Sequence, residues 1–91
     1  MWKSYKSGIE NAIKSEEYDE QTSIELFYPG EYGNYEILCD CYNLIIHSVF
    51  ADTIEDANLK YNQMKKELQE IADTKDEETR EDMICDFVDR W

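Results

Sequence analysis

The side chains best suited to nucleophilic or metal chemistry in this 91-residue sequence are three thiols and one imidazole. A nucleophilic Cys needs a neighbouring base, and His47 is the only histidine that can serve as one. Structural zinc needs four ligands in a tetrahedral arrangement. Cys39 and Cys41 are two residues apart, as on one face of a strand, and Cys85 stands alone, so no second pair completes a zinc site. We therefore predict free thiols that pack as small hydrophobic groups, and no metal.

No other pattern predicts a catalytic residue or a cofactor. The sequence has no Gly-x-Ser-x-Gly turn for a serine nucleophile and no calcium loop, and its three glycines are isolated, so they form no phosphate loop. Among 22 acidic residues, pairs of carboxylates arise by chance and are no signature of acid–base catalysis. We expect a protein that acts by binding a partner and is not an enzyme.

Acidic charge dominates the composition. The 22 acidic residues outnumber 9 basic ones and give a net charge of −13, whereas about 2 to 8 charges are enough to keep a small domain soluble. Such a surface repels nucleic acids and anionic membranes and is attracted to basic surfaces, many of which bind DNA or RNA. The charge is regional, because residues 10–56 hold 12 acids with Lys14 as their one basic residue. The excess is either functional or a means of staying soluble.

The densest row of acids lies near the end of the chain. At the period of a helix, Glu78, Asp82 and Asp86 share one face, and successive carboxylates are about 6 Å apart along the axis. Phosphates along a nucleic-acid strand are spaced on the same order, so such a row can stand in for a phosphate backbone. The alternative is an ordinary solvated helix face. The predicted partner-binding residues here are Glu77, Glu78, Glu81, Asp82, Asp86 and Asp89.

A second candidate contact surrounds a tyrosine-rich loop over residues 29–34. Tyrosine is favoured at interfaces because it adds contact area at low entropic cost and keeps a polar tip. The alternative is ordinary packing at the edge of a small sheet. The residues predicted to take part are Glu31, Tyr32, Glu36 and Asp40.

Hydrophobic periodicity predicts the elements in the first half of the chain. A helix is expected over residues 2–18, where Tyr5, Ile9, Ala12 and Ile13 recur at helical spacing. Alternating or β-branched runs predict strands over residues 23–28, 35–41 and 44–51, with a loop at 29–34 and a tight turn at residues 42–43.

Two helices are expected in the second half of the chain. The apolar stripe over residues 54–73 predicts a long helix with Thr53 as its N-cap, and residues 76–90 predict a last helix capped by Thr74 or Asp76. The predicted fold class is α+β, in the order α-β-β-β-α-α, with a three-stranded antiparallel sheet packed by helices. Residues 1–91 are expected to form a single domain.

The sequence also predicts a compartment. The N-terminus has no apolar signal-peptide region, and no apolar run is long enough to span a membrane. We therefore expect a cytoplasmic protein with reduced thiols.

A strongly acidic chain of under 100 residues with this order of elements resembles the small phage proteins that block host defence. Anti-CRISPR proteins share the size, charge and element order, and anti-restriction DNA mimics share the charge. The likeness covers the whole chain but aligns no motif, and the tyrosine-rich loop departs from a pure phosphate mimic. It implies a phage-encoded inhibitor in the host cytoplasm that occupies the basic groove of a nucleic-acid-binding protein and does not itself bind nucleic acid. The alternative is a non-catalytic assembly module, such as a homodimer, with a solubilising surface.

Overall fold

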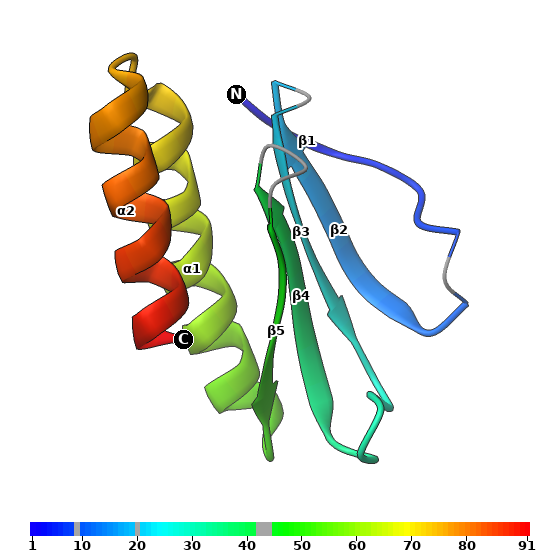
Figure 1. Cartoon of the computed structure of the whole chain (residues 1–91). Helices are drawn as coiled ribbons and strands as arrows, with labels where there is room; N and C mark the ends of the chain where they lie inside the picture. Colours follow the sequence, from blue (N-terminus) through cyan, green and yellow to red (C-terminus); the bar gives the residue numbers. More distant parts are fainter. Residues whose placement is uncertain (9, 20, 42–44) are drawn as a thin grey trace.

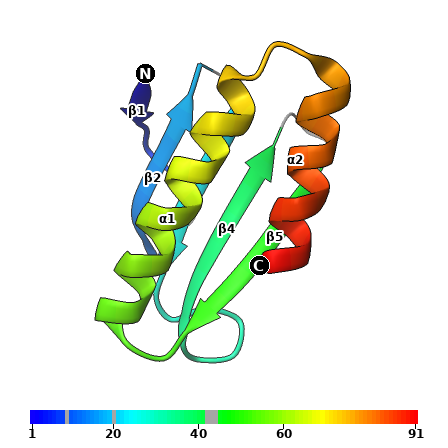
Figure 2. The same ribbon diagram turned by 90° about the vertical axis from the view of Figure 1, so that its left-hand side faces the viewer.

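The computed structural model describes residues 1–8, 10–19, 21–41 and 45–91, and it consists of a β-sheet with a layer of two helices on one face (Figures 1 and 2). The strands are β1 (Trp2–Ser4), β2 (Ala12–Tyr18), β3 (Thr22–Phe27), β4 (Tyr35–Cys41) and β5 (Ile45–Ala51). They form a five-stranded antiparallel sheet whose spatial order follows the sequence. The helices α1 (Ile54–Asp73) and α2 (Glu77–Arg90) follow, so the fold is α+β.

The prediction of a helix over residues 2–18 is wrong, and with it the order α-β-β-β-α-α and the three-stranded sheet. This segment forms β1 and β2, and a tight turn leads into β3, with the Gln21 amide donating to the Tyr18 carbonyl at 2.9 Å and Asp19 at φ +48°. The helical spacing of apolar residues was coincidental; Ile9, on which it partly rested, lies outside the described residues. The strand was hidden because β2 turns charged Lys14 and Glu16 toward α1, so it lacks an apolar alternation.

The three predicted strands correspond to β3, β4 and β5, and β3 begins and ends one residue earlier than predicted. The alternation in β4 is confirmed, since Ile37, Cys39 and Cys41 are fully buried on the helix-facing side. The turn predicted at Tyr42–Asn43 and the first residue of the third predicted strand, Leu44, lie outside the described residues.

Both C-terminal helices are confirmed. The Thr53 side chain caps α1 by accepting from the Asp56 amide at 3.1 Å. Asp76 caps α2 by accepting from the Thr79 amide at 3.0 Å, which lowers the pKa of Asp76, whereas Thr74 ends α1. Neither helix is apolar over the length that a bilayer would require, within the residues that the structure describes.

The core lies between the sheet and the helix layer. The largest buried side chains come from both layers and include Ile24 and Leu26 of β3 and Tyr61 of α1. Trp2 and Trp91 pack at its margins, and their indole nitrogens donate to Gln69 and Glu67 at 3.0 Å.

Burial also sets the chemistry of two of the cysteines. Desolvation raises the pKa of Cys39 to about 12 and that of Cys41 to about 11, which keeps both thiols neutral at pH 7. Cys85, on α2, is exposed. None of the three is in a disulfide.

Candidate partner-binding surface

The helix α2 has two contrasting sides. Its inner side buries Ile84 and Phe87 against the core. The rest of its surface carries six exposed carboxylates, of which Asp86 borders α1 beside Glu67 and Glu70. None of the six makes an ion pair or a hydrogen bond through its side chain with any residue that the structure describes. We call this set the acidic ridge; its members are the predicted residues Glu77, Glu78, Glu81, Asp82, Asp86 and Asp89.

The arginines of α2 are directed toward other parts of the fold. Arg90 pairs with Glu67 of α1, and Arg80 donates to the Thr74 carbonyl at 3.4 Å, in the connection between the helices. Both contacts hold positive charge on the side of α2 that packs on the molecule. The outward side, from Glu78 to Asp89, extends for about 16 Å along the helix axis and presents negative charge to solvent.

The second predicted contact is only partly assembled. Glu31, Tyr32 and Glu36 lie together at one end of the sheet: the Glu31 amide donates to the Glu36 carboxylate at 3.0 Å, and the Tyr32 ring meets that of Phe50 at 5.2 Å. Asp40 is four residues further along β4, which places it about 13 Å from Glu36. The structure therefore separates Asp40 from the other three residues.

We call Glu31, Tyr32 and Glu36 the loop contact. The acidic ridge and the loop contact lie on opposite faces of the molecule. Alternation along β4 turns Ile37 and Cys39 toward the helices, so Glu36 belongs to the face of the sheet that no described helix covers. The other face is covered by the helix layer (Figure 2), and the ridge lies on the exposed surface of α2 within that layer. A single flat partner surface can contact one of them but not both.

Other carboxylates of the sheet are engaged inside the protein. Glu16 accepts hydrogen bonds from Tyr61 and Lys65 of α1, both at 2.7 Å. Although burial of Glu16 opposes ionisation, these two donors hold its pKa below the usual value. Burial and the Glu16 carboxylate together raise the pKa of Tyr61, so the phenol stays protonated and donating.

A second engaged carboxylate lies on the uncovered face. Glu25 of β3 accepts hydrogen bonds from the Tyr5 hydroxyl and, at 3.1 Å, from Ser7. Burial and this contact raise the pKa of Tyr5. Sequence reasoning missed both carboxylate networks because their donors lie far away in the chain, on segments assigned to the wrong element or to a different layer.

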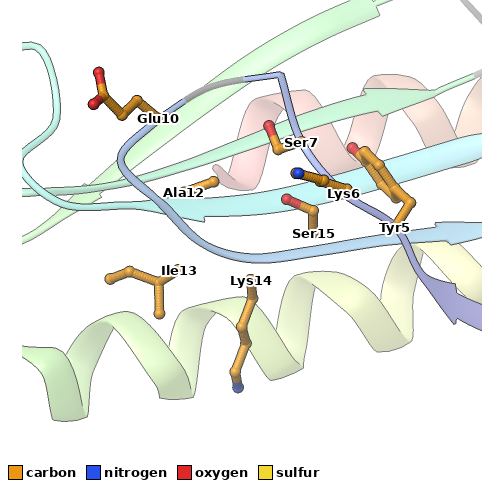
Figure 3. A pocket seen from close by; sticks show the side chains of 8 residues that line it. All are labelled: Tyr5, Lys6, Ser7, Glu10, Ala12, Ile13, Lys14 and Ser15. Atoms are coloured by element: carbon orange, nitrogen blue, oxygen red, sulfur yellow. The ribbon is translucent and has the colours of Figure 1, made fainter.

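The N-terminal segment and β2 enclose a shallow hollow of about 350 Å³. Figure 3 shows Lys6, Ser7 and Ser15 between this segment and β2, whereas Ile13 and Lys14 point toward α1. Of the two serine hydroxyls in its lining, that of Ser7 donates to Glu25 of β3 at 3.1 Å, so it takes part in a contact within the fold.

The imidazole of His47 faces the helix layer. Its ring meets the edge of Phe87 of α2 with the ring centres 6.4 Å apart, and its buried Nε2 atom has no hydrogen-bond partner among the described residues. In the described parts of the chain, no three His, Cys, Asp or Glu side chains come together as metal ligands. Comparisons with models of protein families, with curated proteins and with solved structures found no match to this chain.

Proposed function

We propose that this protein is an acidic inhibitor that occupies the basic groove of a nucleic-acid-binding enzyme, of the defence or CRISPR type, as a nucleic-acid mimic. It acts in the cytoplasm by binding and catalyses no reaction. The observation that supports this proposal best is the acidic ridge, in which six exposed carboxylates follow one helix without an internal partner.

The energetics favour a role in binding for these carboxylates. Like charges at i, i+4, such as Glu78 with Asp82, destabilise a helix by a few tenths of a kcal/mol per pair, and no residue in the described part of the chain makes a compensating contact with them. A basic partner removes this repulsion when it binds. The ridge is fully hydrated in the free protein, so its attraction for a basic groove is long-ranged and sensitive to salt.

The loop contact has a smaller part in this proposal. Because Glu31, Tyr32 and Glu36 face away from the ridge, they contact the same partner only where it wraps around the molecule. The ridge alone is therefore the proposed mimic of phosphates.

An assembly module with a solubilising acidic surface is the second candidate. It is favoured by two apolar or aromatic side chains on the uncovered side, Tyr32 at 73% exposure and Ile46 at 75% exposure. The two candidates respond to salt in opposite ways. Salt weakens the attraction of the ridge for a basic partner, whereas it strengthens self-association of a chain with a net charge of −13.

Affinity capture distinguishes the two candidates. The protein is immobilised, exposed to a nuclease-treated bacterial lysate, and washed at low and then raised salt, and the bound proteins are identified by mass spectrometry. We expect capture of a nucleic-acid-binding enzyme that competing DNA releases. The double variant Glu78→Lys/Asp82→Lys should fail to capture this enzyme. The matched variant Glu10→Lys/Glu55→Lys makes the same charge change at two exposed positions outside the ridge and the loop contact, and it should still capture the enzyme. Equal capture by both variants, or capture only of copies of the chain itself, contradicts the proposal.

A further inference from the structure

The two edges of the sheet differ in length and chemistry. At one edge, β1 has three residues and ends in exposed Lys3 and Ser4. At the other edge, β5 has seven residues, Ile-Ile-His-Ser-Val-Phe-Ala, and its sequence contains no Asp, Glu, Lys or Arg. Short strands, charged side chains and bulges are the usual means by which proteins block strand addition. By these criteria, the edge at β1 is protected against the addition of another strand, whereas the edge at β5 is not.

The outer edge of β5 has backbone groups available for pairing. β5 pairs with β4 on one side, and no described strand lies on the other. Lys60 of α1 donates to the Phe50 carbonyl at 3.0 Å, so an internal donor already occupies the end of the strand nearest α1. The stretch that remains is residues 46–49, where the side chain of Ile46 is 75% exposed.

The helix α2 supplies negative charge above this edge. Phe87 contacts His47 of β5, and Figure 2 shows α2 in front of β5. Met83 and Arg90 turn toward α1, where they meet Thr74 and Glu67. At 3.6 residues per turn, the opposite side of α2 carries Glu77, Glu81 and half-buried Val88. These side chains lie on the side of α2 beyond the outer edge of β5.

We infer that the outer edge of β5 binds an extended basic segment of the partner as a sixth strand. Backbone hydrogen bonds to residues 46–49 hold the segment, and its alternate side chains lie under α2. Lysine or arginine at these positions meets Glu77 and Glu81, and apolar residues meet Val88. This inference rests on the proposed function, because it takes the partner to be basic, and it names the backbone contact that the ridge alone does not provide.

A second copy of the chain fits this edge less well. Pairing β5 with β5 of another molecule in antiparallel fashion puts both helix layers on the same face of one continuous sheet. The two copies of α2 then lie side by side over the new junction, each with six unpaired carboxylates. Repulsion between them opposes this arrangement, whereas a basic segment is attracted by the same charges.

Hydrogen exchange with short synthetic peptides tests the inference. The probe is an eight-residue peptide of alternating lysine and valine with blocked ends. One control replaces each lysine with glutamate, and a second carries a methyl group on every backbone amide nitrogen, which removes the donors and keeps the charge. At a peptide concentration ten times Kd, we expect the outward-facing amides of residues 46–49 to exchange about tenfold more slowly. Neither control should protect them.

A matched pair of variants tests the role of α2. Neutralising the edge carboxylates in Glu77→Gln/Glu81→Gln should weaken binding of the lysine peptide about tenfold at low salt. Neutralising two exposed acids elsewhere, in Glu10→Gln/Glu55→Gln, should weaken it less than about twofold. An equal loss in both variants overturns the assignment of Glu77 and Glu81.

The remaining outcomes separate this inference from the proposed function. Binding of the lysine and N-methylated peptides with equal affinity, with shifts confined to α2 in the NMR spectrum, overturns strand addition and leaves the acidic ridge as the binding surface. If no basic peptide binds at low salt, both the strand-addition inference and the proposed function are contradicted. Protection of β5 by the glutamate peptide overturns a basic partner, because the edge then accepts extended chains whatever their charge. Protection of β5 in the protein alone, as its concentration rises, also overturns it and assigns the edge to a second copy of the chain.

Discussion

The carboxylates of the sheet and those of α2 differ in what surrounds them. On the sheet, Glu16 and Glu25 each accept hydrogen bonds from two side chains, and Glu36 accepts from Ser48 and from the Glu31 amide. On α2, the six carboxylates of the acidic ridge have no such donor among the described residues. In a chain this acidic, the number of acids says little about their role. The presence or absence of an internal partner separates acids that stabilise the fold from acids available to another molecule.

The boundary between the two kinds of carboxylate is sharp along the chain. Asp76 caps α2 through the amide and the hydroxyl of Thr79, which lowers the pKa of Asp76. Its neighbours Glu77 and Glu78 belong to the ridge. We therefore expect substitutions at adjacent acids to have different effects. Asp76→Asn should lower the stability of α2, whereas substitutions in the ridge should weaken partner binding.

The largest effect on folding is expected for Glu16→Gln. The substitution keeps the shape of the side chain but leaves the Lys65 ammonium without its anionic partner and weakens the bond from Tyr61. Because both groups are partly buried, we expect a loss of about 2 kcal/mol in the free energy of unfolding. Urea denaturation followed by circular dichroism measures it. Glu31→Gln, at an exposed carboxylate, is the matched control and should stay within about 0.5 kcal/mol of the original protein.

Because of Glu16, we also expect the protein to become less stable in acid. The pKa of Glu16 is lowered in the folded protein, so the stability that it contributes is fully present above the usual glutamate value of 4.5 and is lost as the pH falls through its folded pKa. Unfolding free energies measured between pH 7 and pH 3 should fall below about pH 5. Glu16→Gln should flatten that fall. An unchanged pH profile in the variant excludes Glu16 from a stabilising role.

A smaller loss is expected in alkali, because the buried thiols must ionise when the chain unfolds. The pKa of Cys41 is raised to about 11 by burial, so its contribution to stability is complete below its usual value of 9.0 and falls as the pH rises toward 11. At pH 10 we expect a loss of about 1 kcal/mol from this residue. Urea denaturation at pH 7 and pH 10 measures it, and Cys41→Ala should show a smaller difference between the two pH values.

The smallest effect on folding is expected in the acidic ridge. Glu78→Lys/Asp82→Lys reverses two unpaired exposed carboxylates, and the gain from relieved repulsion is offset by the loss of a favourable acid in the first turn of α2. We expect a change within about 0.5 kcal/mol. A loss of more than about 1 kcal/mol in the free energy of unfolding would show that these carboxylates stabilise the fold, as Glu16 is expected to do, and would contradict their assignment to partner binding.

Sequence reasoning predicted the second half of the chain well. The periodicity from Ala57 to Ile71 and the caps at Thr53 and Asp76 are local signals, so they fix α1 and α2 without knowledge of the rest of the fold. The same holds for β4, whose alternation is set by Ile37, Cys39 and Cys41. The exposure of the ridge followed from the position of Phe87 and Ile84 on the other side of α2.

The first half depends on contacts between segments far apart in the sequence. β2 turns Glu16 toward α1, and that placement is tolerated because Lys65 and Tyr61, 49 and 45 residues later, neutralise and bind it. No local pattern contains this information. For the same reason, the sequence did not show that Glu36 and the acidic ridge lie on opposite faces, since that depends on which face of the sheet the helices cover.

The most direct test of the account is the salt dependence of partner binding by matched variants. The enzyme captured from lysate is titrated onto the original protein, onto Glu78→Lys/Asp82→Lys and onto Glu10→Lys/Glu55→Lys between 50 and about 200 mM salt. The account predicts that affinity falls at least tenfold over this range for the original protein and for the second variant. The ridge variant should bind far more weakly and with a smaller salt slope. A flat salt response, or the same loss of affinity in both variants, would contradict the claim that the acidic ridge is the binding surface.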